Sequence, residues 1–180
     1  MKTATTLENL QVAFNGESNA RAKYLAFAEK AGAEGYGKVA ALFRAAARAE
    51  EIHAKNHAVV IRRMGAEPAA DIQPVEVKST PENLQAAIVG ETYEYETMYA
   101  GFLVQARAAG EAQAERTFDY ASEAERGHAR LYSEALAHLD AWKVAAPFYV
   151  CPACSHTVTE VEFARCPVCS TRGETFEKVA

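Results

Sequence analysis

The first 150 residues of this 180-residue chain contain no cysteine, because all four cysteines lie among the last thirty residues. They form two Cys-x-x-Cys pairs, which in a reducing compartment indicate metal ligands and not disulfides. No apolar run approaches the roughly 20 residues that a membrane-spanning helix needs, and residues 1–10 lack the apolar stretch of a signal peptide. These absences predict a cytoplasmic protein without a membrane segment.

Positive charge is also in short supply. The chain has 19 lysines and arginines against 24 aspartates and glutamates, which gives a formal net charge of -5 at pH 7. The acidic excess is spread along the chain, so the sequence offers no broad basic surface for a phosphate backbone. We therefore do not expect nucleic acid to be a partner.

The chain is 49% hydrophobic and 24% charged, and it is long enough for one core and a small appendage. We expect a main domain over residues 1–145 and a small domain over residues 146–180. After Trp142 the helical pattern gives way to short pieces around the cysteines, followed by β-favouring residues such as Thr175 and Phe176. A tail this short needs a bound metal to hold its fold.

Long helices are predicted throughout the main domain, which indicates a mainly α fold. Thr6 is a candidate N-cap for the first helix, and Pro81 is well placed in the first turn of the third. The stretch from residue 65 to residue 80 is long enough to cross the length of a bundle. The predicted helices cover residues 7–30, 39–64, 81–109 and 112–139.

An internal repeat relates the two halves of the main domain. The tetrapeptide Glu-Asn-Leu-Gln begins at Glu8 and again at Glu82, and each copy has another glutamate nine residues later, at Glu17 and Glu91. A Glu-x-x-His motif follows in each half. The first two glutamates are 74 residues apart, whereas the Glu-x-x-His motifs, which begin at residues 50 and 125, are 75 apart. The main domain is therefore a duplicated pair of helices with one residue of slippage.

The repeated glutamates and histidines have the pattern of a metal site. Residues three apart share a helix face, so Glu50 with His53, and Glu125 with His128, can each direct an oxygen and a nitrogen to one point. With Glu17 and Glu91 they supply the ligand plan of di-iron and di-manganese carboxylate bundles. Burying so many carboxylates without cations would cost several kcal/mol each. The sequence predicts two metals bridged by Glu50 and Glu125.

Other side chains near this pattern admit two interpretations. Glu94 lies about one turn beyond Glu91 on the same face and either adds a carboxylate to one metal or occupies a solvated position. Tyr24 and Tyr99 either donate hydroxyl hydrogen bonds to ligands or pack as core aromatics. His57, four residues after His53, fits a surface or capping position better than one beside the ligands.

The cysteine pairs predict a second metal site. Cys151, Cys154, Cys166 and Cys169 can place four sulfurs at the corners of a tetrahedron around iron or zinc. Iron in such a site transfers electrons, whereas zinc only holds the fold. A redox-active site in the bundle needs an electron supply, which favours iron.

These motifs resemble those of the rubrerythrin family over the whole chain, which implies a four-helix ferritin-like bundle followed by a small rubredoxin-like β domain that binds metal. The resemblance implies that His53 exchanges with a carboxylate when one iron changes oxidation state. It also implies that the bundle ligands are Glu17, Glu50, Glu91, Glu94, Glu125 and His128. The matching segments are residues 16–21, 50–55, 90–94, 98–99 and 125–128.

The resemblance further implies an activity and its partners. Family members reduce hydrogen peroxide to water at the di-iron site, with electrons from NAD(P)H delivered through a reductase or rubredoxin and the four-cysteine iron. Glu94, His53, Tyr24 and Tyr99 are then the candidate catalytic residues. The family also implies a head-to-tail homodimer, and a tail this short would reach a neighbouring subunit's site more easily than its own.

One departure from the family bears on the second metal. Rubredoxin-type turns usually have glycine after the second cysteine of each pair, but this chain has Ser155 and Ser170. Glycine tolerates positive φ cheaply, and serine can occupy that conformation at modest cost. Zinc therefore stays an alternative for the tail. Two other functions also stay open, a ferroxidase or iron-handling protein, and a zinc-ribbon interaction module with an inert bundle.

Overall fold

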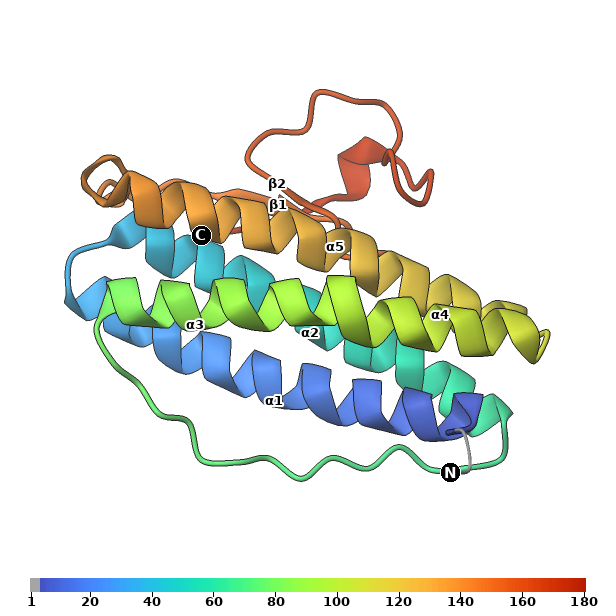
Figure 1. The fold of residues 1–180 in the computed structure, drawn as a ribbon. Coiled ribbons are helices and arrows are strands. Elements are labelled where there is room, and N and C mark those ends of the chain that lie inside the picture. The colour runs from blue at the N-terminus through green and yellow to red at the C-terminus, as the bar shows by residue number, and fades with distance from the viewer. Residues whose placement is uncertain (1–3) are drawn as a thin grey trace.

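Four helical rods lie side by side in the computed structural model, which describes residues 4–180 (Figure 1). The third rod is composite: α3 passes through one π-helical segment, η1, into α4. Residues 1–3, on which part of the signal-peptide expectation rests, lie outside the described residues. The helices are α1 (Thr6–Ala33), α2 (Gly37–Arg63), α3 (Thr80–Tyr93), η1 (Glu94–Met98), α4 (Tyr99–Ala108) and α5 (Ala112–Ala137). The predicted mainly α, ferritin-like bundle is confirmed.

The duplication extends to the helix starts. Thr5 caps α1 and Ser79 caps α3, and each forms a capping box with a glutamate three residues later, Glu8 or Glu82. Such a box satisfies backbone N–H groups that the first turn leaves unpaired. The predicted N-cap at Thr6 is therefore wrong by one residue, since Thr6 is already helical and buried.

The segment between α2 and α3 runs extended along α1, as its length predicted (Figure 1). Side-chain amides on successive turns of α1 hold it. Gln11 donates to the carbonyl of Glu67, Asn15 accepts from the amide of Asp71, and Asn19 accepts from the amide of Gln73. This crossing places α3 and α5 together so that the second pair of helices can complete the bundle.

The π-helical segment η1 accounts for the one-residue slip in the repeat. Glu17 and Glu91 are 74 residues apart, but Tyr24 and Tyr99 are 75 apart, so the extra residue lies between Glu91 and Tyr99. A π-bulge accommodates one inserted residue without ending a helix, and such bulges are frequent at functional sites. The expected continuous helix to about residue 109 is thus interrupted beside the predicted ligands.

Two related aromatic clusters pack on either side of the bundle centre. Phe43 lies with its ring centroid 5.4 Å from Phe27 and 5.9 Å from Tyr24. Phe118, 75 residues later, lies 5.4 Å from Phe102 and 5.9 Å from Tyr99. Packed rings fix side-chain positions closely. The clusters therefore hold the two tyrosines in equivalent places.

The tail after α5 begins with a 3-10 turn, η2 (Leu139–Trp142), and contains a three-stranded antiparallel sheet in the order β2-β1-β3. Its elements are β1 (Phe148–Val150), β2 (Thr157–Val158), η3 (Gly173–Thr175) and β3 (Glu177–Val179). Thr175 and Phe176 precede the last strand and are not part of it. The predicted small β domain is confirmed, and we propose the division into residues 1–145 and 146–180.

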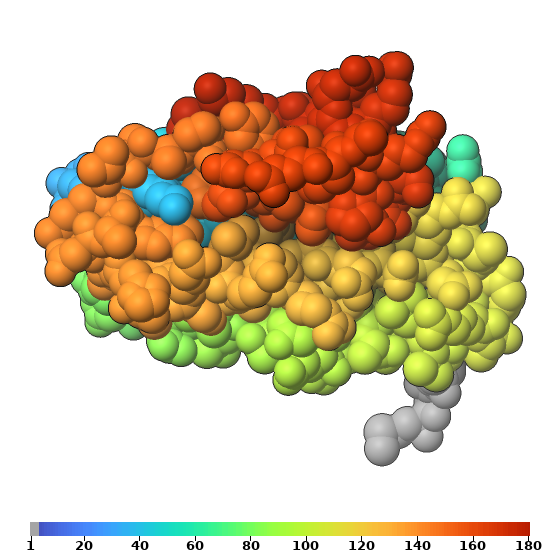
Figure 2. Space-filling model, turned by 90° about the horizontal axis from the view of Figure 1, so that it is seen from above, coloured from blue at the N-terminus to red at the C-terminus, as the bar shows by residue number. Residues whose placement is uncertain are grey.

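The tail lies on the bundle of its own chain, over α2 and α5 (Figure 2). This placement differs from the expectation that so short a tail reaches a neighbouring subunit more easily. Phe148 and Val150 of β1 belong to the main hydrophobic core. Arg48 of α2 donates to both carboxylate oxygens of Glu177, at 2.7 and 2.9 Å. Apolar burial and a bidentate ion pair therefore fasten the sheet to α2.

None of the helices in residues 4–180 is long and apolar enough to cross a membrane.

Candidate metal centres

Six ionisable side chains meet at the middle of the bundle. α1 supplies Glu17 and α3 supplies Glu91, while α2 and α5 each supply a glutamate and a histidine three residues apart. All six are buried, with relative exposures between 0 and 1%. The helical spacing predicted from the sequence thus brings Glu17, Glu50, His53, Glu91, Glu125 and His128 together.

The six residues form two overlapping groups, in each of which the donor atoms all lie within 4.8 Å of one another. One group contains Glu17, Glu50, His53 and Glu125, and the other contains Glu50, Glu91, Glu125 and His128. Both histidines turn Nδ1 inward: His53 Nδ1 lies 3.0 Å from Glu50 Oε2, and His128 Nδ1 lies 2.8 Å from Glu125 Oε2. Only Glu50 and Glu125 belong to both groups, as expected of carboxylates that bridge two metals.

The two tyrosines hold ligand carboxylates across the repeat. Tyr24 of α1 donates its hydroxyl proton to Glu91 of α3, and Tyr99 of α4 donates to Glu17 of α1. Both rings are fully buried. The prediction that these hydroxyls hydrogen-bond candidate ligands agrees with this geometry, and each bond fixes one carboxylate oxygen.

His57 is a correction to the sequence analysis. It is fully buried, not on the surface, with Nε2 3.1 Å from the Tyr99 hydroxyl and Nδ1 3.0 Å from the Thr117 hydroxyl. The repeat places Tyr132 at the equivalent position in the second half. Because Tyr132 is aromatic and buried, the repeat itself carried a signal that position 57 faces the core.

The electrostatics of the cluster indicate that it needs cations. Burial, reinforced by neighbouring carboxylates, raises the pKa of Glu50 and of Glu125 well above its usual range. Burial also opposes ionisation of Glu17, but contacts with His53 and His57 outweigh it and hold the Glu17 pKa well below its usual range. Burial lowers the pKa of His53 too, yet the charge of Glu125 reverses this and raises it. Protons therefore stand where metal ions would otherwise balance the charge.

The unpaired oxygens also fit bound metal. One carboxylate oxygen of each of the four glutamates is buried and makes no hydrogen bond within residues 4–180. Such groups are costly unless something satisfies them. Their atoms are Glu17 Oε2, Glu50 Oε1, Glu91 Oε2 and Glu125 Oε1. Oxygen and imidazole donors that converge in two overlapping sets suit iron or manganese.

Glu94 stands apart from this cluster. It is the first residue of η1, it is half-buried, and its donors do not fall within either group. It lines a pocket beside α1, together with Gly16, Ala20 and Lys23. Burial and the charges of Glu17 and Glu91 raise its pKa well above the usual range. Glu94 thus lies within electrostatic reach of the cluster but outside its coordinating distance.

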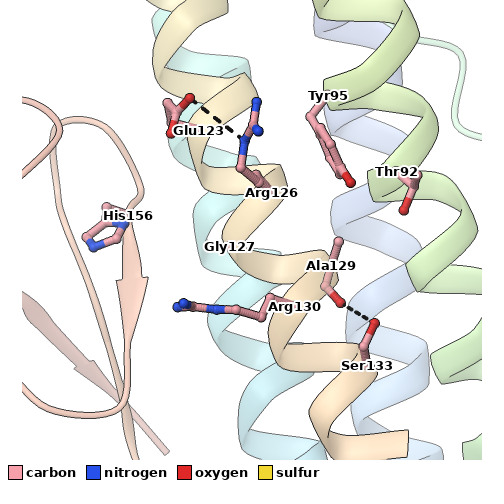
Figure 3. Close-up of a pocket in the computed structure, with 9 residues that line it drawn as sticks. All are labelled: Thr92, Tyr95, Glu123, Arg126, Gly127, Ala129, Arg130, Ser133 and His156. Atoms are coloured by element: carbon pink, nitrogen blue, oxygen red, sulfur yellow. Dashed lines mark hydrogen bonds and ion pairs between the residues drawn. The ribbon is translucent and has the colours of Figure 1, made fainter.

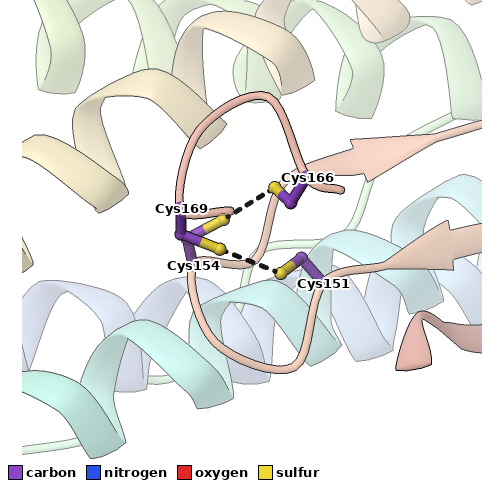
Figure 4. Close-up of side chains that lie close together, drawn as sticks. All are labelled: Cys151, Cys154, Cys166 and Cys169. Atoms are coloured by element: carbon purple, nitrogen blue, oxygen red, sulfur yellow. Dashed lines mark hydrogen bonds between the residues drawn. The ribbon is translucent and has the colours of Figure 1, made fainter. Parts of the chain in front are cut away.

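The four cysteines converge in the tail (Figure 4). Cys151 Sγ lies 3.5 Å from Cys169 Sγ, and Cys154 Sγ lies 3.6 Å from Cys166 Sγ. A tetrahedron with metal–sulfur bonds of about 2.3 Å has edges of roughly 3.8 Å, so these separations suit one metal ion. None of the four forms a disulfide.

The two serines that depart from the family pattern take up the backbone conformation expected there. Ser155 has φ 65° and Ser170 has φ 63°. In each turn the serine amide donates 2.9 Å back to the carbonyl of the first cysteine, Cys151 or Cys166. Serine therefore fills both glycine positions and the two cysteine turns have the same geometry.

The tail also contacts the outer edge of the bundle site, which the sequence analysis did not anticipate. Ser155 Oγ hydrogen-bonds His53 Nε2, and Thr157 Oγ1 lies 3.0 Å from His128 Nε2. Nothing in the spacing of these residues signals a contact with histidines about a hundred positions earlier, or about thirty for Thr157. Only the docking of β1 and β2 on α2 and α5 creates it.

A polar surface pocket lies close to these contacts (Figure 3). Arg126 and Arg130 project from α5, and His156 of the tail stands across from them. The Arg126 guanidinium lies 5.1 Å from the centre of the Tyr95 ring. Thr92 and Gly127, the neighbours of Glu91 and His128, line the same pocket, so it reaches the backbone beside two of the ligands.

Comparison with known proteins agrees with this description. The family model described as Rubrerythrin matches residues 8–136. Rubrerythrin-2 of Clostridium acetobutylicum is 36% identical over 98% of this chain and 98% of its own length. Nigerythrin of Nitratidesulfovibrio vulgaris is 37% identical over 97% of this chain and 88% of its own.

A solved structure shares both the bundle and the tail. The fully reduced, all-ferrous state of nigerythrin superimposes with a TM-score of 0.91 at 36% identity, over 99% of this chain and 88% of that one. A bacterioferritin from Desulfovibrio desulfuricans matches 77% of this chain and 81% of its own, with a TM-score of 0.70 at 25% identity.

Proposed function

Because this chain belongs to the rubrerythrin family of di-iron, ferritin-like proteins, we propose that it is a non-haem peroxidase that reduces hydrogen peroxide to water. One peroxide, two protons and two electrons give two waters. The observation that carries the proposal is the contact between a carboxylate–histidine cluster and a four-cysteine cluster, joined at Ser155. A two-electron oxidant needs both a site that reacts and a carrier that restores electrons.

We assign the ligands by the two groups of donors. Glu17 and His53 would hold one iron and Glu91 and His128 the other, with Glu50 and Glu125 shared. When bound, the irons of the bundle would supply the electrons that peroxide accepts, and the iron of the tail would return them one at a time. The Tyr24 and Tyr99 hydroxyls keep Glu91 and Glu17 aimed at the site.

Glu94 is proposed as a carboxylate that joins the cluster during turnover. It lines the pocket beside α1, where Gly16 and Ala20 leave little side-chain bulk next to Glu17. A carboxylate brings a negative charge and an imidazole brings none, so exchange of Glu94 with His53 would adjust the charge of the site to the oxidation state. The π-helical backbone at Glu94 supports such a movement, since its hydrogen bonding departs from that of the flanking helices.

The remaining assignments concern supply and setting. We propose that an NAD(P)H-dependent reductase or a rubredoxin donates electrons to the tail and that the protein forms a homodimer. The four free cysteines need a reducing compartment, which favours the cytoplasm. Removal of peroxide there would protect an oxygen-sensitive cell from oxidative stress.

Rapid-mixing kinetics on anaerobic, fully reduced protein test the activity. Metal content per chain is measured first, and the reduced protein is then mixed with hydrogen peroxide or with dioxygen while the absorption of both centres is followed. The proposal expects about three irons per chain and a faster reaction with peroxide. Glu94→Ala should slow peroxide turnover much more than it lowers the melting temperature.

The rival functions give different results. A faster reaction with dioxygen would favour a ferroxidase, which a bundle shared with bacterioferritin makes the first alternative. Zinc in the tail would remove the internal electron carrier, and an iron-free bundle would favour an interaction module. Unchanged peroxide turnover in Glu94→Ala would contradict the role given to Glu94.

A further inference from the structure

Both histidines of the bundle site have their outer nitrogens covered by hydroxyl groups of the cysteine tail. Ser155, the residue after Cys154, contacts His53 Nε2, and Thr157 at the start of β2 contacts His128 Nε2. All four side chains are buried, with relative exposures of 4% or less. The tail therefore touches the site through two equivalent contacts, one for each half of the repeat.

The direction of these hydrogen bonds follows from the other partners of the hydroxyls. Ser155 donates its hydroxyl proton to the carbonyl of Cys154, and Thr157 donates to the carbonyl of Ser155 at 2.9 Å. A hydroxyl has one proton to give, so each can only accept from the facing histidine. Nε2 must then carry the hydrogen in both rings, which leaves the lone pair on Nδ1.

That lone pair faces the carboxylates. His53 Nδ1 lies 2.8 Å from Glu125 Oε1, and His128 Nδ1 lies 3.6 Å from Glu91 Oε2, in addition to the shorter contacts described above. A nitrogen lone pair so close to carboxylate oxygens is repelled unless a cation lies between them. The tail hydroxyls thus select the tautomer that binds metal at the inner nitrogen.

We propose that Ser155 and Thr157 are positioning residues that couple the two metal centres, so that metal at the cysteines strengthens metal binding in the bundle. Metal holds the tail segment in its fold, the folded segment presents both hydroxyls, and these orient the histidines. Such coupling is reciprocal, so bundle metal also strengthens metal binding by the cysteines. The inference rests on the metal centres of the proposed function but not on peroxide as the substrate.

The second cysteine turn supplies a matched control. Ser170 has nearly the same positive φ as Ser155 and the same backbone hydrogen bond to the first cysteine of its pair. It is exposed, however, and its carbonyl accepts from Arg165 on the surface. Glycine relieves the same backbone strain at both positions, so only the loss of the Ser155 hydroxyl affects a histidine.

Equilibrium titration with ferrous ion, in competition with a chromophoric chelator under anaerobic conditions, measures bundle affinity in the full chain. Loss of an outer partner of a ligating histidine typically weakens metal binding by about 10- to 100-fold. We expect that loss in Ser155→Gly and in Thr157→Val. Ser170→Gly, and Thr157→Ser, which keeps its hydroxyl, should stay within about twofold of the parent protein.

The coupling itself is measured by emptying the tail. Cys169→Ser removes one tail ligand, and in the parent protein it should weaken ferrous binding by the bundle about tenfold or more. In the Ser155→Gly, Thr157→Val background the same change should have little further effect. Long-range proton–nitrogen NMR spectra of zinc-loaded protein should find His53 and His128 protonated at Nε2.

Two results would overturn the proposal. One is a bundle affinity that does not change when the tail is emptied, and the other is an equal loss in Ser170→Gly and Ser155→Gly, which would indicate general weakening of the tail. A protein that binds metal as expected but fails to reduce peroxide would refute the proposed activity and leave the coupling intact.

Discussion

Replacing Tyr24 or Tyr99 by phenylalanine removes one hydroxyl each from the outer edge of the candidate di-iron site. Each hydroxyl donates to a ligand carboxylate of the opposite half, Glu91 or Glu17, and each ring is fully buried in an aromatic cluster that phenylalanine can fill. The substitution therefore changes the hydrogen bond and leaves the packing almost unchanged. We expect both variants to fold and to bind metal more weakly.

The size of the loss can be worked out in two ways. A hydrogen bond to a charged group contributes about 1.5–3 kcal/mol. Loss of an outer-shell partner typically costs 10- to 100-fold in metal affinity, which corresponds to about 1.4–2.8 kcal/mol at 1.4 kcal/mol per factor of ten. The two figures agree, so Tyr24→Phe should weaken ferrous binding by about 10- to 100-fold.

The two positions should not behave alike, because only Tyr99 has a second polar neighbour. His57 Nε2 lies 3.1 Å from the Tyr99 hydroxyl, and Tyr99→Phe would leave that buried nitrogen without this partner. An unpaired buried polar group costs about 1–3 kcal/mol. Tyr99→Phe should therefore also lower the free energy of unfolding of the metal-free protein, whereas Tyr24→Phe should change it little.

Chelator competition gives the affinities, and urea unfolding of the metal-free variants gives the stabilities. Tyr132→Phe is the control, because Tyr132 lies in the same cluster as Tyr24 but makes no hydrogen bond to a candidate ligand within residues 4–180. Its ferrous affinity should stay within about twofold of the parent. Affinities of Tyr24→Phe and Tyr99→Phe equal to that of Tyr132→Phe would refute the reasoning.

Three further changes test the rest of the molecule. A methyl group on Gly173 would lie 2.2 Å from the carbonyl oxygen of Phe163, so Gly173→Ala should destabilise the tail by about 1–3 kcal/mol, seen as faster metal release from the cysteines; Gly101→Ala, which meets no neighbour, should not do so. Contacts with Lys30 and then Thr80 lower the pKa of Glu34 to about 2. A depressed carboxyl pKa stabilises the fold above its unfolded value of about 4.5, so the melting-temperature advantage of the parent over Glu34→Gln should be full at neutral pH and vanish as pH falls from 4.5 to 2. Removing all metal with a chelator should lower the free energy of unfolding by about 2.7 kcal/mol relative to protein at a free metal concentration of 100 Kd, and an unchanged urea midpoint would argue against metal in the bundle.

The sequence predicted the bundle and the ligand cluster well because both depend on local periodicity and on an internal repeat. Glu50 with His53 share a helix face whatever the rest of the chain does, and the second copy repeats that local constraint. The position of η1 was also encoded, since the 74-residue and 75-residue offsets bracket it between Glu91 and Tyr99. That slip predicts a local insertion but not that a π-bulge absorbs it.

Contacts between distant segments could not be predicted in the same way. His57 was misplaced because its environment depends on Tyr99 and Thr117, which come from other helices. The contact of Ser155 with His53 depends on how the tail docks, and neither residue has a neighbour in the sequence that reveals it. Local patterns specify elements and faces, whereas these contacts follow from tertiary packing.

The sharing of Glu50 and Glu125 between both donor groups has a consequence for the order of folding. Each group draws residues from both helical hairpins, α1 with α2 and the composite third rod with α5, so neither hairpin alone contains a complete site. The long connection between α2 and α3 must close before the hairpins meet, which makes this a late contact. Metal capture should therefore lag behind helix formation in refolding, and it would mark chains in which both hairpins have docked.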